Sequence, residues 1–260
     1  MPELLEVEYY RRLAQATLGR LIVAVDAPDE RYLRRGVTAA DLAAVLIGAM
    51  IERTDRRGKL LLLEVDRGPV LGLRFGMTGR LFVDGVAAID QLAYSSAASP
   101  PEWRRLALRF ADGGDLVMVD PRRLGSVVLD PSLDGLGPDA ASIEAVGLAA
   151  VLHGARTALK ARLMDQSRLA GLGNLLTDEI LWRARLDPTR AAGGLDRKEQ
   201  RRLYRELATV LAELDGRGGS HTGELFRARN RGGRCPRCEE ELGRATVAGR
   251  TTFWCPAEQR

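Results

Sequence analysis

The first residues after the start methionine place a secondary amine beside a carboxylic acid, because the chain reads Pro2-Glu3. If Met1 is removed, the proline nitrogen becomes an N-terminal amine, a group whose pKa of ~8 leaves it partly neutral near neutral pH. A neutral amine can attack C1′ of a deoxyribose and form a Schiff base, while a neighbouring acid transfers protons. Proline and acidic residues are also common in the first turn of a helix. The pair alone leaves both interpretations open.

Basic residues gather in clusters beside glycine-containing motifs, although the net charge is only +4, with 39 basic and 35 acidic residues. The clusters lie at 53–59, 104–105, 122–123, 183–190 and 227–237. A single cluster is usually a solvated face, but their repetition favours a phosphate-binding surface. Hydrophobic residues make up 45% of the chain, no apolar run is long enough to span a bilayer, and the start is acidic. We therefore expect a cytoplasmic globular protein.

The elements that must position these residues change character along the chain. Five apolar residues share one helical face at the start, which puts Pro2 and Glu3 at a helix N-terminus: Leu4, Leu5, Val7, Leu13 and Leu18. A second helix is predicted from about Thr38. Short β-type runs lie at 21–25, 60–65, 70–75, 81–83, 106–110 and 116–119, with a hairpin turn at 112–115. This half predicts a helix packed on an antiparallel β-sandwich.

The second half is predicted to be helical. Residues 130–139 are rich in Pro, Gly and Asp and predict a linker, and the helices are expected at 141–152, 157–165, 175–184 and 196–214. The turn at 171–174 precedes one of these helices, so its backbone N–H groups and the Asn174 amide can contact a phosphate. The same turn can also be a helix C-cap followed by an N-cap.

All three cysteines lie near the C-terminus. Cys235 and Cys238 have the spacing of a metal-binding knuckle, and Cys255 follows after residues 239–254. A disulfide is improbable in a reducing cytoplasm.

Five segments, in order and spacing, make the chain similar to the formamidopyrimidine-DNA glycosylase and endonuclease VIII family over nearly its whole length. They are Pro2-Glu3 with Glu6, 56–63, 76–79, 120–125, and 160–181 with its motifs at 164–166, 171–174 and 178–181, and a terminal cysteine hairpin containing 249–252 follows. The resemblance implies an α+β fold. Its parts are an N-terminal helix with an antiparallel β-sandwich (1–129), the linker (130–139), a helix-two-turn-helix DNA-binding domain (140–230) and a zinc-finger-like β-hairpin (231–260).

The resemblance also implies a bifunctional DNA glycosylase and AP lyase that excises oxidised bases in base excision repair. Pro2 would attack C1′ and Glu3 would assist departure of the base. The other implied site residues are Lys59 and Arg250 for catalysis, Arg74, Met77, Arg122, Arg123, Leu124, Lys160 and Asn174 for DNA binding, and Cys235, Cys238, Cys255 and Glu258 for Zn²⁺. The implied partner is double-stranded DNA with a damaged base or an abasic site. A nucleoid-associated monomer without membrane contact is expected.

Several positions depart from the family pattern and keep three functions open. Leu5 replaces a proline, Arg74 a histidine, Leu124 a phenylalanine and Glu258 the fourth cysteine. Replacing a thiolate by a carboxylate weakens a zinc site. The segment between 219 and 235, which covers 8-oxoguanine in formamidopyrimidine-type members, is short. The alternatives to an oxidised-purine glycosylase are an endonuclease VIII-like enzyme for oxidised pyrimidines and a protein that binds damage without cutting.

Overall fold

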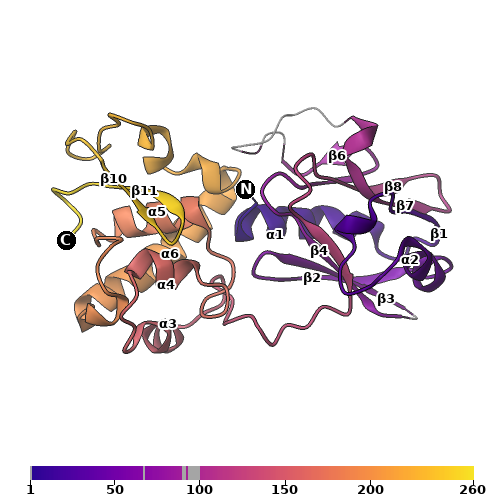
Figure 1. Ribbon diagram of the computed structural model, residues 1–260, viewed down its shortest axis with the longest axis horizontal. Coiled ribbons are helices and arrows are strands. Elements are labelled where there is room, and N and C mark those ends of the chain that lie inside the picture. Colours follow the sequence, from indigo (N-terminus) through magenta and orange to yellow (C-terminus); the bar gives the residue numbers. More distant parts are fainter. Residues whose placement is uncertain (1, 67, 90–91, 93–99) are drawn as a thin grey trace. The chain divides into compact units, whose positions relative to one another are not determined.

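The computed structural model describes residues 2–66, 68–89, 92 and 100–260, which form two compact units (Figure 1). Unit 1 comprises Glu6–Leu133 together with Pro2, and unit 2 comprises Glu3–Leu5 and Asp134–Arg260. Each unit has its own buried apolar cluster.

Unit 1 consists of two antiparallel sheets with two helices. One sheet has the strand order β1-β7-β8-β5-β6 and the other the order β2-β3-β4-β9. The elements are α1 (Leu4–Ala14, its first two residues counted with unit 2), β1 (Ile22–Asp26), α2 (Ala39–Leu46), β2 (Ile51–Arg57), β3 (Leu60–Val65), β4 (Val70–Arg74), β5 (Arg80–Val83), β6 (Val86–Ala87), β7 (Arg104–Phe110), β8 (Asp115–Val119) and β9 (Ser126–Leu129).

The core of unit 1 follows from its apolar residues. Both sheets contribute side chains to one buried cluster with α1 and α2, and Leu61 and Leu63 of β3 belong to it. Leu60 and Leu62, on the other face of β3, are also buried. Helix α2 begins at the predicted place because Thr38 and Asp41 form a reciprocal capping box. Strands β2, β6 and β9 were not predicted. The polar sequence of β2 conceals a strand that pairing with β3 stabilises.

Unit 2 is helical and ends in a β-hairpin. Its elements are α3 (Ala145–Leu152), α4 (Leu159–Met164), α5 (Asn174–Arg183), α6 (Arg197–Arg217), β10 (Gly243–Val247) and β11 (Arg250–Trp254). Residues 175–182 of α5 are all buried, so this helix is surrounded by the other elements. Helix α6 begins with a capping box between Asp196 and Glu199 and ends at Gly218, whose φ of 102° suits glycine.

The fold class predicted from the sequence is confirmed, with shifted boundaries. Residues 130–139 contain no helix or strand, and the four predicted helices are present, although α3 begins at 145 rather than 141. One core prediction was wrong, because Leu18 lies after the end of α1 and is 41% exposed. No helix in the described part of the chain has the length and apolar character needed to cross a membrane.

Candidate active site and nucleic-acid interface

The Glu3 carboxylate is fully buried and caps helix α5. Its oxygens accept hydrogen bonds from the backbone N–H groups of Gly173 (2.8 Å), Leu175 (2.8 Å) and Leu176 (3.2 Å). These groups belong to the first turn of the helix, where N–H groups have no partner within the helix and where negative charge is favoured. The acid predicted beside the nucleophile is therefore held in one place by backbone groups 170 residues further along the chain.

Gly173 allows this contact because it has no side chain. A Cβ atom at this position would lie 2.3 Å from Cδ of Glu3, far inside van der Waals contact. The turn before it is held by Gln166, whose amide donates to the Leu172 oxygen at 2.9 Å and accepts from the Gly171 N–H at 3.0 Å. The residues of the 164–174 segment thus shape the backbone that receives Glu3.

Asn174 is the first residue of α5. Its Oδ1 atom is buried and has no hydrogen-bond partner in the described part of the chain. Its predicted contact with a phosphate stays a prediction.

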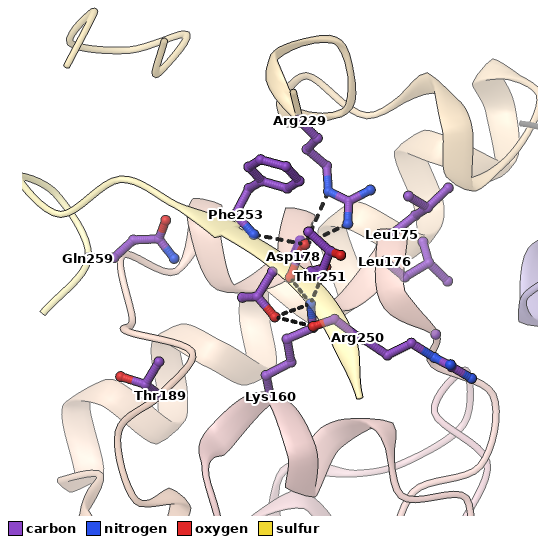
Figure 2. Close-up of polar contacts among 12 residues, drawn as sticks. Lys160, Leu175, Leu176, Asp178, Thr189, Arg229, Arg250, Thr251, Phe253 and Gln259 are labelled. Atoms are coloured by element: carbon purple, nitrogen blue, oxygen red, sulfur yellow. Dashed lines mark hydrogen bonds and ion pairs between the residues drawn. The ribbon is translucent and has the colours of Figure 1, made fainter. Parts of the chain in front are cut away.

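Lys160 does not have the exposure that a phosphate contact requires. Its side chain is 0% exposed, and Nζ lies 2.7 Å from Oδ1 of Asp178 and donates to Oγ1 of Thr252 at 2.8 Å (Figure 2). Burial lowers the pKa of Lys160 below its usual range, while Asp178 opposes this shift. The expectation that Lys160 binds DNA is corrected: in this structure the lysine joins α4 to α5 and β11.

Arg250 begins β11 and is exposed. In Figure 2 its side chain extends away from the buried polar cluster around Lys160 and Asp178. This position makes the guanidinium accessible to a ligand, as its predicted role requires.

In unit 1, the buried carboxylate of Asp120 ties together two predicted DNA-binding motifs. Oδ1 accepts from the Thr78 hydroxyl at 2.5 Å, and Oδ2 accepts from the N–H groups of Leu124 (2.9 Å) and Gly125 (2.8 Å). The turn at 121–125 is thereby fixed beside the 76–79 loop. Leu124, within that turn, is 49% exposed, so it is not a core residue, which agrees with a role as an apolar wedge.

The other predicted site residues of unit 1, which include Lys59 for catalysis, lie at accessible positions. Met77 and Lys59 are partly buried, Lys59 in the turn between β2 and β3, whereas Arg74, Arg122 and Arg123 are exposed. Arg123 donates to Oδ1 of Asp29 at 2.6 Å. Burial alone would raise the pKa of Asp29, but Arg123 and Arg105 lower it below its ordinary value.

The Sγ atoms of Cys235, Cys238 and Cys255 lie within 4.8 Å of one another and can bind a metal ion. Glu258 is not part of this group, in contrast to the expectation that it supplies the fourth ligand. Its Oε2 atom lies 3.2 Å from Nη1 of Arg237 and 3.5 Å from Nε of Arg185. Two guanidinium groups therefore hold the carboxylate, which explains its separation from the thiols.

Two buried aspartates that hold the site together, Asp120 and Asp178, were given no role in the sequence prediction. Asp120 and Asp178 lie inside recognised motifs, but their functions depend on partners that sequence spacing does not indicate. Arg229 was likewise part of a basic cluster, yet its Nη2 donates to Oδ2 of buried Asp178 at 2.8 Å. Their position inside a motif was the one signal that the sequence offered for the two aspartates.

Sequence patterns of two known domains match most of the chain. The formamidopyrimidine-DNA glycosylase N-terminal domain matches residues 1–127, and the formamidopyrimidine-DNA glycosylase H2TH domain matches residues 135–223. The formamidopyrimidine-DNA glycosylase of Paracoccus denitrificans is 37% identical over 288 aligned positions that cover 100% of both chains. The chain belongs to the formamidopyrimidine-DNA glycosylase family.

Solved structures of formamidopyrimidine-DNA glycosylases share the whole fold. The complex of Lactococcus lactis Fpg with DNA containing an abasic site has a TM-score of 0.83 at 26% identity, and MutM in complex with DNA containing carbocyclic 8-oxo-G has 0.84 at 28%. Each comparison covers 100% of both chains. Membership in the formamidopyrimidine-DNA glycosylase family confirms the predicted family, its fold and its enzyme class, a DNA glycosylase with lyase activity at abasic sites.

Proposed function

We propose that this protein removes oxidised purines from duplex DNA and then cleaves the strand, with Pro2 as the nucleophile. The proline nitrogen attacks C1′, the bond from C1′ to the base breaks, and the base leaves with a proton. Opening of the sugar ring gives a Schiff base between Pro2 and C1′. Elimination of the 3′ and then the 5′ phosphate follows, and hydrolysis of the imine frees the proline.

The capped carboxylate of Glu3 is the observation that carries this proposal. Three backbone N–H groups hold it next to Pro2 in the chain, where it can accept the proton that the proline nitrogen loses on attack and pass that proton to the ring oxygen. Because α1 begins at Leu4, the positive end of its dipole lies close to the proline nitrogen and favours the neutral amine. The neutral form is the one that attacks carbon.

The remaining site residues act through the bound DNA. A base within a duplex must be extruded before C1′ can be reached, and Met77, Arg122 and Leu124 would fill the vacated space. Lys59, Asn174 and Arg250 would hold the phosphates around the extruded nucleotide.

The comparisons support an oxidised purine as substrate, because the relatives are named for formamidopyrimidine and one structural neighbour holds 8-oxo-G DNA. The short segment after α6 supports the alternative of an oxidised pyrimidine. It forms two short 3-10 helices, Ser220–Thr222 and Leu225–Ala228, rather than a long covering loop. We also propose that the protein is a monomer that works in the cytoplasm, where it associates with the nucleoid.

The three cysteine thiols suit Zn²⁺, which prefers sulfur ligands in a four-coordinate site. We propose that Cys235, Cys238 and Cys255 hold zinc and that Glu258 does not. A bound ion would link the residues before β10 to those after β11. With three protein ligands the site should be weaker than a four-cysteine site.

Borohydride trapping tests the proposal on duplexes carrying 8-oxoguanine, formamidopyrimidine, an oxidised pyrimidine or a preformed abasic site. We expect a covalent complex whose DNA is attached to residue 2, formed with both purine lesions and the abasic site. Blocking Met1 removal with an inserted glutamine should abolish trapping. Attachment at Lys59 would refute the nucleophile, trapping with the pyrimidine lesion alone would refute the substrate, and binding without trapping would indicate a protein that only senses damage.

A further inference from the structure

The buried cluster around Asp178 contacts strand β11, which begins at Arg250 (Figure 2). We propose that Arg229 is a positioning residue for Arg250, acting through Asp178 and strand β11. This inference rests on the proposed role of Arg250 as a phosphate contact. It assigns to Arg229 a function other than direct contact with DNA.

Each carboxylate oxygen of Asp178 forms an ion pair with a different cation. Lys160 lies 2.7 Å from Oδ1, and Arg229 donates to Oδ2 from Nη2 (2.8 Å) and Nε (3.1 Å). The side chains of Lys160 and Asp178 are 0% exposed and that of Arg229 is 6% exposed. Charge-assisted hydrogen bonds in such a place are stronger than those at the surface, because little water competes for the donors.

The same cluster binds the backbone of β11. The Thr252 hydroxyl accepts from Lys160 and donates to the carbonyl oxygen of Arg250 at 3.1 Å. The N–H of Phe253 points to Oδ2 of Asp178 at 3.5 Å, and the guanidinium of Arg229 lies 5.7 Å from the centre of the Phe253 ring. Arg229 therefore touches both the acid and the strand that the acid holds.

These contacts fix the position of the backbone at Arg250, the first residue of β11. Thr252 is fully buried, whereas 248–251 at the hairpin tip are exposed, so the tip has no comparable packing of its own. A hydrogen-bonded chain thus runs from Lys160 through Thr252 to the carbonyl of Arg250. If Arg229 is replaced, Oδ2 of Asp178 loses the Nε and Nη2 donors and can rotate away from the N–H of Phe253. Strand β11 then loses a contact two residues from the hairpin tip.

Arg229 is the residue of the cluster whose replacement should leave the protein folded. Replacing Asp178 would leave two buried cations without an anion, and replacing Lys160 would remove the donor to Thr252, so either variant can fail to fold. Arg229→Gln leaves the neutral Lys160–Asp178 pair in place. Arg229→Lys keeps a cation beside Asp178 and serves as the conservative variant.

The experiment measures the affinity for a duplex with a stable abasic-site analogue as a function of salt. We expect Arg229→Gln to weaken binding about tenfold and to lower the slope of log K against log salt by roughly one unit, as Arg250→Ala should. The double variant should have the slope of Arg250→Ala alone, and Arg229→Lys should restore the wild-type slope. Arg201→Gln, an exposed charge change on α6, should leave the slope unchanged.

Two further readouts separate positioning from a general loss of structure. Arg229→Gln should raise KM for abasic-site cleavage about tenfold while kcat stays within about twofold, and thermal unfolding of the wild type and of Arg229→Lys should coincide. An unchanged slope in Arg229→Gln, or slope losses that add in the double variant, would overturn the positioning role. If Arg250→Ala itself leaves the slope unchanged, the proposed role of Arg250 fails, and the inference fails with it.

Discussion

Replacing Gly173 by alanine should displace the catalytic acid without removing it. A Cβ atom at this position would lie 2.3 Å from Cδ and 2.5 Å from Oε1 of Glu3, and both distances are too short for any real contact. The Glu3 side chain is fully buried, so it can move only by giving up hydrogen bonds to the first turn of α5. The substitution therefore tests whether the location of the carboxylate matters, with its charge intact.

The size of the effect follows from the bonds that are lost. Hydrogen bonds to a charged group make a net contribution of roughly 1.5–3 kcal/mol each, so losing two of the three costs up to about 3–6 kcal/mol. Because a displaced carboxylate can keep part of these hydrogen bonds in longer form, we expect the free energy of unfolding to fall by about 2–4 kcal/mol. For a chain of this length that lowers Tm by roughly 5–15 °C.

The assay compares two reactions of Gly173→Ala under single-turnover conditions. Base excision should fall about 100-fold or more, the range in which proton transfer by a side chain contributes. Cleavage of a preformed abasic site should fall less, within about tenfold, because no base has to leave. Gly216→Ala is the matched control, because a Cβ atom there meets nothing within 4 Å and α6 should be unchanged or slightly stabilised.

Two outcomes would refute this reasoning. If Gly173→Ala melts and excises bases as the wild type does, Glu3 is not held by α5 in the way described. If both reactions fall equally while Gly216→Ala is normal, the acid does not have separate roles in excision and cleavage.

Three further predictions concern charge and metal. Glu3→Gln should lose base excision but retain cleavage of a preformed abasic site in the same assay, and equal losses would contradict this. Mild chelation should remove zinc with partial loss of DNA binding, measured by metal analysis and titration, whereas zinc that survives prolonged chelation would reveal a fourth protein ligand. Hydrogen bonds from the backbone N–H groups of Glu199 and Lys198 lower the pKa of Asp196 below its ordinary value of 3.8. The carboxylate therefore stabilises the fold above pH 3.8, and this contribution is lost as the pH falls through the lower pKa of the folded state. The difference in unfolding free energy between pH 7 and pH 3 should therefore shrink in Asp196→Asn, and an unchanged difference would refute the linkage.

The sequence by itself determined the elements that depend on local pattern. Alternating or helical spacing of apolar residues located most strands and all four helices of unit 2, and Thr38 marked the start of α2. The ordered motifs identified the family and nearly all candidate site residues. These features are local because a helix cap or a strand period involves only residues a few positions apart.

Tertiary structure decided which partner each of these side chains has. Glu3 finds its donors on α5, Lys160 is buried against Asp178 rather than exposed to DNA, and Glu258 pairs with arginines instead of joining the cysteines. The polar sequence of β2 becomes a strand only because β3 lies beside it. Such contacts join residues far apart in the chain, and burial decides whether a charge faces a ligand or another charge, which residue spacing does not encode.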